Sequence, residues 1–438
     1  MKIFETHHPG VDIGRLVDDP ATVLADLVPD GRNAVRMVVE QDGLALAHAP
    51  TGTAANIGSF RQRDFENEAA FNVVFAVPTG VGAQTGGHAG DANPTLMMLA
   101  GVADHVFTHP NVCNASDINE LPVNSSYIEG SVLSRFMMGD VALARARNNR
   151  CLVLVARHRV DRFVTTTINA VNAAVSSYGF DPVKVVVFED CEMEVEFSQS
   201  GRASGVVHRI EELKEIVDAH EGQFDAIAVC SAIKHDRAML DAYYLDREGA
   251  QVNPLGGIEA LLSHWLSLYT NRPVAHCPMM EDEDIELADY GITDPRLAAE
   301  MVSVTFAQCI FKGLQRAPRI VPPRTRDAFA AEDINALVMP QGCFGLPIIA
   351  ALKQGIPVIA VRERLNSRGF RGLVRDLPWA RGQYVEVENY FEAAGHLACL
   401  KAGVSPRSVR RPLDVSDVLD ESRGGRTTDA DRQYAAGG

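Results

Sequence analysis

This sequence lacks the signatures of several classes of protein. Its eight cysteines form no Cys-x-x-Cys pair, which argues against a structural zinc site and against a small disulfide scaffold. No apolar run approaches the roughly 18 residues that cross a bilayer, and the opening residues MKIFETHHPG contain no apolar core of a signal peptide. We therefore expect a soluble cytoplasmic protein with no membrane partner, since free thiols in this number fit a reducing compartment.

Positive charge is also scarce. The chain has 41 lysines and arginines against 57 aspartates and glutamates, which gives a formal net charge of -16. This balance argues against a broadly basic face, so no nucleic-acid partner is expected. The partner that we expect is a small-molecule substrate, and a homo-oligomer is compatible with the composition.

Buried strands are the clearest positive signal. Of the 438 residues, 46% are hydrophobic, enough for a large core. Continuous rather than alternating apolar runs are typical of parallel strands covered on both faces. Eight such runs alternate with helical patterns, at 71–77, 105–109, 151–156, 183–188, 224–230, 273–277, 334–339 and 356–361. The predicted fold class is α/β, with a mostly parallel, doubly wound sheet or sheets, helices on both faces and small β-hairpin additions.

Changes in composition divide the chain into five expected segments. The last is predicted to be a disordered tail, because arginine, aspartate, serine and glycine cannot bury a core. The segments are an N-terminal hairpin and loop region (1–70), an α/β segment with a glycine-rich loop (71–150), a central α/β domain with a hairpin insertion (151–322), a C-terminal α/β segment (323–404) and the tail (405–438).

Turn and cap signals predict further elements. Residues 36–49 are typical of a hairpin around an Asp-Gly turn, and residues 197–207 of a second hairpin with glycine-containing turns. Asp294 is a good N-cap, and the pattern after it predicts one long helix to about Gln315. Gly355 is expected to end a short helix before the last apolar run.

A glycine-rich loop follows the first apolar run. Between residues 78 and 94, Gly86 and Gly87 let the backbone turn tightly, and successive N–H groups there can hold an anionic group. His88 and Asp91 are candidate binding and acid/base residues, and Asp91 or Asn93 could instead cap the next helix. The alternative is a tightly turned surface loop without a ligand.

Two nucleotide fingerprints are missing from this loop. The Gly-x-Gly-x-x-Gly spacing fails because Thr85 stands where the third glycine should be, and no Gly-Lys-Ser/Thr sequence follows. Nicotinamide and P-loop nucleotides are therefore not expected, and the cofactor stays unknown. A divalent metal is compatible with the acidic stretch 188–196, although alternating glutamates there more simply indicate a solvated strand edge, so no metal ligand is named.

Polar residues follow two further strands. His109, Asn111 and Asn114 come after the second apolar run, where amides and an imidazole could form a pocket wall or ordinary turns. Ser231 and Lys234 follow the fifth run. A desolvated lysine could activate a serine, or Lys234 could pair with substrate charge.

A sixth candidate loop, MPQGCFGLP, contains the best candidate for a nucleophile. Cys343 precedes a helix, and the N-terminus of a helix lowers the pKa of a thiol. Gly342 and Gly345 could bind a ligand through their backbone. His276, which ends the sixth run, is equally well explained as a core histidine.

Three motifs carry a resemblance to a known family. PTGVGAQTGGHAGDANP, ADHVFTHPNVCNAS with YIEGS, and GIPVIAVRE resemble the uncharacterised domain-of-unknown-function family 3326 of bacteria, cyanobacteria and chloroplast-containing eukaryotes, over most of residues 70 to 400. The resemblance implies no reaction. It adds weight to Gly86, Gly87, Asp91, His109 and Asn111, and the family pattern has an aromatic residue where His88 stands.

These patterns predict a small-molecule enzyme. The expected reaction is hydrolysis, cleavage or transfer of an acyl or amide-type group on a small carboxylated metabolite, whose anionic group the glycine-rich loops hold. Asp91 and His109 would act as acid and base. Two alternatives stay open, a non-catalytic binding or regulatory protein and a metal-dependent lyase or hydrolase.

Overall fold

A computed structural model describes residues 60–413, apart from 79, 81, 89–90, 110–116, 118–119, 198–202, 247–250, 284–288, 304, 342, 344 and 364–383, together with the backbone of three strands nearer the N-terminus. The chain separates into two compact units, residues 1–397 and 398–438. The described strands are β1 (Lys2–Pro9), β2 (Leu27–Pro29), β3 (Ala34–Glu40), β4 (Asn72–Phe75), β5 (His105–Thr108), β6 (Ser125–Tyr127), β7 (Ala142–Ala144), β8 (Arg150–Ala156), β9 (Asp181–Phe188), β10 (Met193–Phe197), β11 (Ala203–His208), β12 (Ala226–Lys234), β13 (Val274–Met279), β14 (Arg319–Val321), β15 (Ile334–Pro340), β16 (Val358–Val361) and β17 (Tyr384–Val387). The described helices are α2 (Asn93–Ala100), α4 (Gly130–Met137), α5 (Asp161–Tyr178), α6 (Glu211–Ala219), α7 (Arg237–Tyr244), α8 (Gly256–Thr270), α10 (Pro295–Met301), α11 (Ala307–Arg316), η2 (Ala331–Asp333), α12 (Leu346–Gln354), α13 (Tyr390–Lys401) and α14 (Pro406–Val409).

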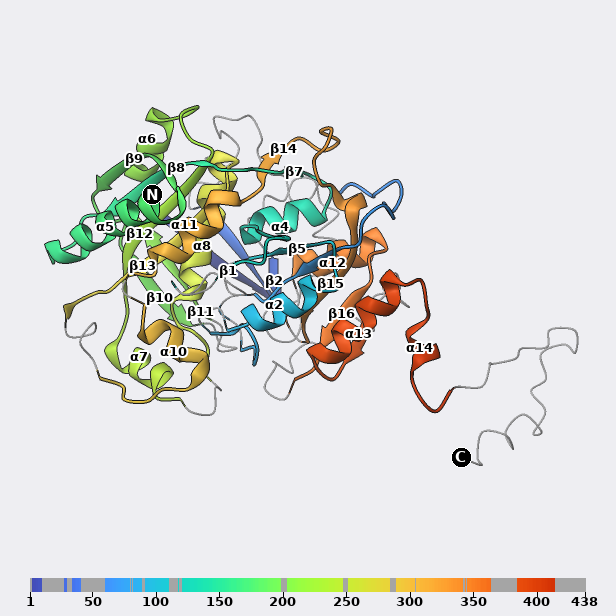
Figure 1. The fold of residues 1–438 in the computed structure, drawn as a ribbon. Helices are drawn as coiled ribbons and strands as arrows, with labels where there is room; N and C mark the ends of the chain where they lie inside the picture. The colour runs from blue at the N-terminus through green and yellow to red at the C-terminus, as the bar shows by residue number, and fades with distance from the viewer. Residues whose placement is uncertain are drawn as a thin grey trace, which may run out of the picture. The chain divides into compact units, whose positions relative to one another are not determined.

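One sheet has six strands in the order β17-β16-β15-β4-β5-β6, and every pair in it is parallel. Phe75 of β4 lies beside Val338 of β15 on one side and Thr108 of β5 on the other. The chain proceeds from β4 toward β5 and β6, but from β15 toward β16 and β17. The strand order therefore reverses between β4 and β15, which Figure 1 shows as blue and orange segments lying together.

The larger sheet has nine strands and combines two patterns. Its parallel part runs β9-β8-β12-β13, and β10 adds to the far end of β12. Antiparallel strands β11, β1, β3 and β2 continue beyond β10. The strand order of the parallel part reverses between β8 and β12. A separate two-stranded sheet pairs β7 with β14.

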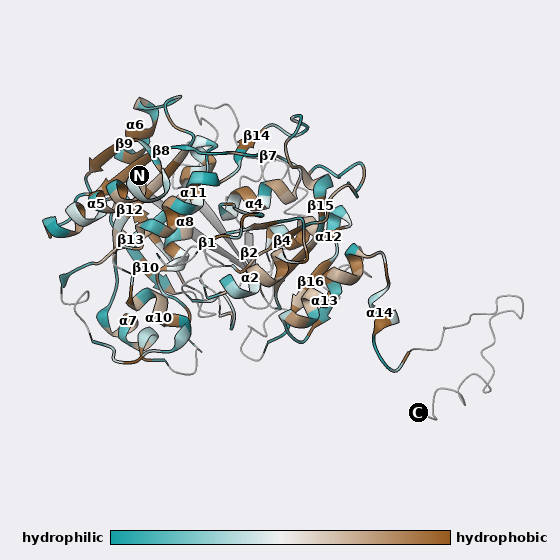
Figure 2. Ribbon diagram, viewed as in Figure 1, coloured by the Kyte–Doolittle hydropathy of each residue, from teal (hydrophilic) through white to brown (hydrophobic). Residues whose placement is uncertain are grey.

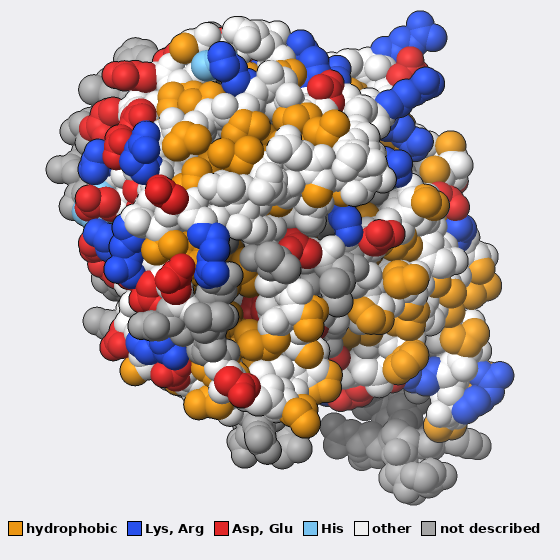
Figure 3. Space-filling view, turned by 60° about the vertical axis from the view of Figure 1, so that its left-hand side comes forward, with side chains coloured by type: hydrophobic (Ala, Val, Ile, Leu, Met, Phe, Trp, Pro, Cys, Tyr) orange, Lys and Arg blue, Asp and Glu red, His pale blue; other side chains and the backbone are white. Residues whose placement is uncertain are grey.

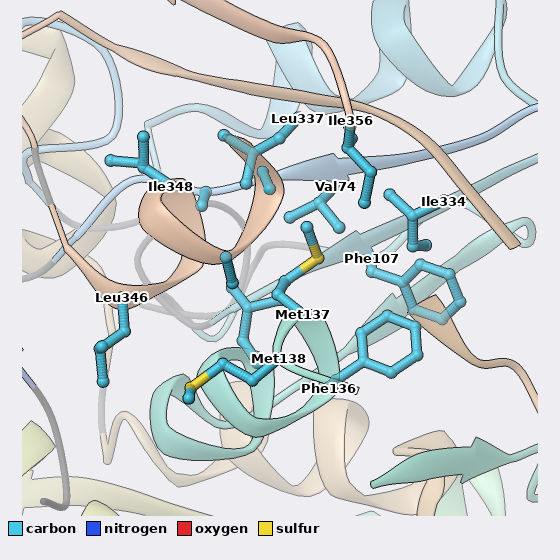
Figure 4. Packing of buried hydrophobic residues seen from close by; sticks show 14 of the residues in the cluster. Val74, Phe107, Phe136, Met137, Met138, Ile334, Leu337, Leu346, Ile348 and Ile356 are labelled. Atoms are coloured by element: carbon cyan, nitrogen blue, oxygen red, sulfur yellow. The ribbon is translucent and has the colours of Figure 1, made fainter. Parts of the chain in front are cut away.

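Helices cover both faces of each parallel region. In the larger sheet, even-numbered residues of β8 such as Leu152 pack with α6 and α8, whereas odd-numbered residues of the same strand such as Val153 pack with α5 and α11. In the six-stranded sheet, Val74 faces α4 and α12, and Figure 4 shows Met137 reaching toward it. Phe75, on the opposite face, meets Tyr390 of α13 with ring centroids 5.4 Å apart. Figure 2 shows the strands as the most apolar parts of the ribbon.

The predicted fold class is confirmed, and all eight apolar runs contain strands. The hairpin predicted at 197–207 is β10 and β11, with its turn outside the described residues. Gly355 ends α12 in the left-handed conformation, as expected. Glu194 and Glu196 of β10 are exposed, although β10 lies between two strands rather than at an edge.

One local prediction is corrected. The single helix expected from Asp294 to Gln315 is two helices, α10 and α11, because Phe306 is left-handed and the Asp117 carboxylate caps a new helix by accepting from the N–H of Gln308 at 2.9 Å. The strand Ala34–Glu40 pairs antiparallel with β1 and β2, and the hairpin partner expected for it after residue 43 lies outside the described residues.

The remaining expectations concern the ends of the chain and the membrane. Residues 414–438 of the predicted tail lie outside the described residues. Among the described residues, no helix combines the length and the apolar character that crossing a membrane requires.

Candidate functional site

Two loops flank the reversal of strand order in the six-stranded sheet. The glycine-rich loop follows β4, and the loop from Gln341 to Gly345 follows β15, the neighbouring strand. In open parallel sheets, ligands bind at the carboxyl ends of the strands beside such a reversal. His109 follows β5, the other neighbour of β4, so its backbone lies at the same edge of the sheet.

Asp91 organises the glycine-rich loop. Its carboxylate accepts hydrogen bonds from the backbone N–H of Gly86 at 3.0 Å and of His88 at 3.2 Å. Ala92 is the N-cap residue of α2, and no side chain caps that helix, so the expected capping by Asp91 or Asn93 is wrong. Burial raises the pKa of Asp91, although the two N–H groups oppose the shift. The anionic group next to these amides is therefore the loop's own carboxylate.

The glycine-rich loop contacts both sheets. Ala203, at the start of β11, donates its N–H to the carbonyl of Gly80 at 3.1 Å. Thr85 donates its hydroxyl to Glu363, just after β16, at 3.0 Å. Gly87 must be glycine, since a Cβ there would lie 2.2 Å from the carbonyl oxygen of Ala83. The loop thus joins the carboxyl edge of the six-stranded sheet to the antiparallel part of the larger one.

Buried polar atoms that have no hydrogen-bond partner among the described residues gather at this edge. They are Thr108 Oγ1 at the end of β5, Gln341 Nε2 after β15, Glu363 Oε2 after β16 and the Tyr390 hydroxyl at the start of α13. Burial, opposed by Thr85 and helped by the charge of Asp91, raises the pKa of Glu363. Because a buried polar group without a partner costs free energy, such a group is a candidate for binding a ligand or water.

A second group of polar side chains lies on the other side of Asp91. The His88 ring stacks on Tyr243 of α7 with centroids 5.7 Å apart, and burial and the charge of Arg296 lower the pKa of His88 to about 4. Burial raises the pKa of Glu300 to about 8, with further contributions from Glu259 and Asp91. Four buried atoms of this group have no hydrogen-bond partner in the part of the chain that the structure describes: His88 Nδ1, the Tyr243 hydroxyl, Arg296 Nη1 and Glu300 Oε2.

Ser231 and Lys234 of β12 are not brought together. They are three residues apart in a strand, so their side chains point to opposite faces of the sheet. Lys234 is about half exposed and pairs with Glu192 at 3.6 Å. Ser231 is fully buried, and its hydroxyl lies 2.9 Å from Nε2 of His276, whose Nδ1 lies 3.1 Å from a carboxylate oxygen of Glu259.

The other predicted residues are placed as follows. Cys343 is buried beside the N-terminus of α12, and Gly345 is the extended N-cap residue of that helix. His109 is partly buried. Asn111, Asn114 and Gly342 lie outside the described residues. The described part of the chain contains no group of three or more His, Cys, Asp or Glu side chains arranged to hold a metal ion.

Sequence reasoning missed most of the acidic and aromatic members of the site. Gln341 and Glu363 directly follow predicted strands, so their position was a usable signal. Glu300 and Arg296 lie in α10, where helical periodicity distinguishes buried from exposed faces but not a functional carboxylate from a structural one. Glu259 joins His276 only through the packing of α8 on β13, which no local pattern encodes.

Comparisons with known proteins identify a family but no activity. An uncharacterized lipoprotein of Synechococcus sp. is 31% identical over 342 residues, which cover 77% of this chain and 92% of that protein. Among solved structures, one match is the ligand-free, open structure of a substrate binding protein with adhesive properties from Clostridium difficile. The two sequences are 10% identical, and the match covers 73% of this chain and 99% of that one. Its TM-score of 0.17 is too low to indicate a shared fold. A family model described as "Protein of unknown function (DUF3326)" matches residues 72–410. The chain therefore belongs to the DUF3326 family.

Proposed function

We propose that this protein is an enzyme that hydrolyses, cleaves or transfers an acyl or amide-type group on a small carboxylated metabolite. The observation that carries the proposal is the set of buried, unpartnered polar atoms on both sides of Asp91, beside the reversal of strand order. A merely structural core satisfies its buried polar groups. A polar substrate would supply the missing partners.

Acid–base chemistry is supported by the opposite pKa shifts in this cluster. Glu300, with a pKa of about 8, holds a proton at neutral pH, whereas His88, with a pKa of about 4, is a neutral ring there. Titratable groups whose environments separate their pKa values in this way are typical of acid and base pairs in active sites. Asp91 links the two, because its charge contributes to the raised pKa of Glu300.

Arg296 is the proposed anchor for the carboxylate of the substrate. Its Nε and Nη2 atoms bind Asp294 at 2.9 and 3.0 Å, which fixes the guanidinium plane. The remaining Nη1 is buried and has no hydrogen-bond partner among residues with a described position. A guanidinium donor held in this way binds a carboxylate oxygen with defined geometry. We therefore assign the binding of the substrate carboxylate to Arg296 and not to the backbone amides of the glycine-rich loop, because those amides already donate to Asp91.

A thermal-shift experiment tests the anchor. Carboxylic acids of two to six carbons are screened for stabilisation of the full chain, because a ligand that binds only the folded state raises the Tm. At least one acid is expected to stabilise the wild type but not Arg296→Gln. Arg326→Gln is the matched control, because Arg326 is almost fully exposed and pairs with its neighbour Asp327 at 3.5 Å. Stabilisation that is equal in all three proteins contradicts the anchor.

Incubation with a metabolite extract, read by mass spectrometry, tests turnover. The wild type is expected to consume a carboxylated compound, and Asp91→Asn is expected to reduce consumption at least tenfold while the protein remains folded. If carboxylates stabilise the protein but nothing is consumed, the alternative of a non-catalytic binding protein replaces this proposal. If no carboxylate stabilises it and nothing is consumed, the proposal is wrong.

Two remaining parts of the proposal concern metals and location. A metal-dependent lyase finds no support among the described residues, which contain no donor cluster. The seven described cysteines are all free thiols, which supports a cytoplasmic location, although the Synechococcus relative is named a lipoprotein.

Figure 3 shows acidic and basic side chains intermixed on the face that it presents, so this face offers no extended basic track for nucleic acid.

A further inference from the structure

We infer that Ser231, His276 and Glu259 form a nucleophilic relay for acyl transfer, in which the Ser231 hydroxyl attacks the carbonyl carbon of an ester or amide substrate. The inference rests on the proposed function and names its nucleophile. It is based on the two hydrogen bonds that connect the three side chains, 2.9 Å between Ser231 Oγ and His276 Nε2 and 3.1 Å between His276 Nδ1 and Glu259 Oε2.

Three separate elements hold the relay in place. Ser231 lies near the carboxyl end of β12, His276 lies on the adjacent parallel strand β13, and Glu259 lies in the first turn of α8. The register pairs Val229 with His276, which places Ser231 diagonally opposite the imidazole on the same face. Helix α8 packs on that face and brings its carboxylate to the other ring nitrogen. The arrangement is therefore fixed by the sheet register rather than by a flexible loop.

The hydrogen bonds assign a role to each group. A carboxylate accepts from Nδ1–H, which leaves Nε2 of the neutral ring free to accept the hydroxyl proton of Ser231. A nucleophile, a base and a group that orients the base are the minimal parts of such a site. Lys234 cannot be the base, because it lies on the opposite face of β12 and pairs with Glu192.

The relay adjoins the proposed substrate site through the first turn of α8. A Cβ on Gly80, which begins the glycine-rich loop, would lie 3.4 Å from Cα of Gly257, two residues before Glu259. The charges of Glu259 and Asp91 both help to raise the pKa of Glu300. The relay and the acid cluster are thus neighbours through Glu259 and the first turn of α8.

The proposed reaction has two halves, acylation of Ser231 and hydrolysis of the acyl-serine, and water is the second reactant. The Ser231 Oγ–carbon bond forms as the hydroxyl proton passes to His276 Nε2. The bond from the carbonyl carbon to the leaving oxygen or nitrogen then breaks, and Nε2 returns the proton to the leaving group. Water attacks the acyl-serine in the same way, releases the acid and restores the hydroxyl. Glu259 stabilises the imidazolium in both halves and is a positioning residue.

Met193 packs directly against the serine hydroxyl. Its sulfur lies 3.2 Å from Ser231 Oγ and occupies space beside the hydroxyl, while Ser231 itself is fully buried. An unbranched methionine side chain can change rotamer more easily than a branched one. Met193→Ala is therefore expected to speed the reaction of Ser231 with a small acylating or phosphorylating reagent.

Covalent labelling of the full chain tests the relay. Diisopropyl fluorophosphate is expected to add one group to Ser231, detected by intact mass and peptide mapping. Ser231→Ala and His276→Gln are expected to slow labelling at least 100-fold, and Met193→Ala to accelerate it several-fold. Ser263→Ala is the matched control, because Ser263 is also buried but donates only to the Ala260 carbonyl.

Rescue by a conservative variant separates positioning from a merely structural role for Glu259. Glu259→Gln should slow labelling, because the carboxylate that orients the imidazole through Nδ1 is lost, and Glu259→Asp should restore part of the rate. No adduct in either the wild type or Met193→Ala, or an adduct unaffected by Ser231→Ala, overturns the relay. Carboxylate stabilisation that persists in that case leaves the proposed substrate site intact.

Discussion

Nδ1 of His264 makes a hydrogen bond with the Glu129 carboxylate, which joins the middle of α8 to the start of α4. Both residues are buried, and the same carboxylate accepts from the N–H of Ser131 at 2.9 Å and of Val132 at 3.2 Å. Burial opposes ionisation, but His264 and these hydrogen bonds hold the pKa of Glu129 below its usual range. One carboxylate therefore caps α4 and attaches it to the helix that carries Glu259.

Removing one partner of this pair should be costly. His264→Ala leaves a buried carboxylate without its ionic partner, and we expect the free energy of unfolding to fall by about 3–5 kcal/mol. Urea denaturation measures the change. His208→Ala is the matched control, because His208 faces Glu194 at 3.9 Å on the surface, where such pairs contribute about 0–1 kcal/mol. Equal effects of the two substitutions would show that the buried pair is not coupled.

The packing of α8 against the start of β11 depends on a glycine in the first turn of the helix. A Cβ at Gly257 would lie 2.1 Å from the carbonyl oxygen of Ala203, a backbone atom that cannot rotate away. Gly257→Ala should therefore destabilise the protein by about 1–3 kcal/mol, the usual cost of overpacking. Gly395→Ala, in a helix with open space around the new methyl group, should be neutral or stabilising by up to about 1 kcal/mol. Urea denaturation of both variants measures the difference, and a tolerated Gly257→Ala would contradict this packing.

The sequence was sufficient for the strands but not for the connections between distant segments. Runs such as 151–156 and 334–339 predicted strands because continuous apolar residues suit a sheet covered on both faces. The break between α10 and α11 could not be predicted, since its cap is Asp117, far away in the chain. The candidate site divides in the same way. Its glycine-rich loop follows a recognisable strand, whereas Glu300 and the Ser231–His276 contact depend on packing and register.

The decrease in the free energy of unfolding at acidic pH should depend on His88. Burial and Arg296 lower its pKa from 6.5 to about 4, so the unfolded chain binds a proton more readily and stability is lost as pH falls from 6.5 toward 4. Between pH 7 and 5 this linkage contributes about 2 kcal/mol. His88→Phe keeps a ring against Tyr243 but cannot titrate, so urea denaturation should show a shallower loss for this variant.

A second histidine provides the internal comparison for this prediction. Burial and Arg145 also lower the pKa of His105 to about 4, so His88→Phe should remove only about half of the loss attributable to the two rings. The variant with both rings replaced should lose nearly all of it. A decrease at acidic pH that is unchanged in His88→Phe would mean that His88 is not buried as a neutral ring.

The decrease in the free energy of unfolding at alkaline pH should depend on Glu300. Burial raises its pKa from 4.5 to about 8, so the folded protein binds the extra proton. The stabilisation is fully present below pH 4.5 and is lost as pH rises through 8. Between pH 5.5 and 8 the expected loss is about 3 kcal/mol. Glu300→Gln is neutral at every pH, so its free energy of unfolding should lack this decline.

Glu215→Gln is the matched control for the Glu300 variant, because Glu215 is exposed on α6 and its removal should leave the alkaline decline in place. Urea midpoints at pH 5.5, 7 and 8 compare the three proteins. Carboxylate binding at Arg296 should also weaken in the same range, since ionised Glu300 adds negative charge to the cluster. If the wild type and Glu300→Gln decline in parallel, Glu300 is ionised throughout, and it cannot be the proton donor that the proposed chemistry requires.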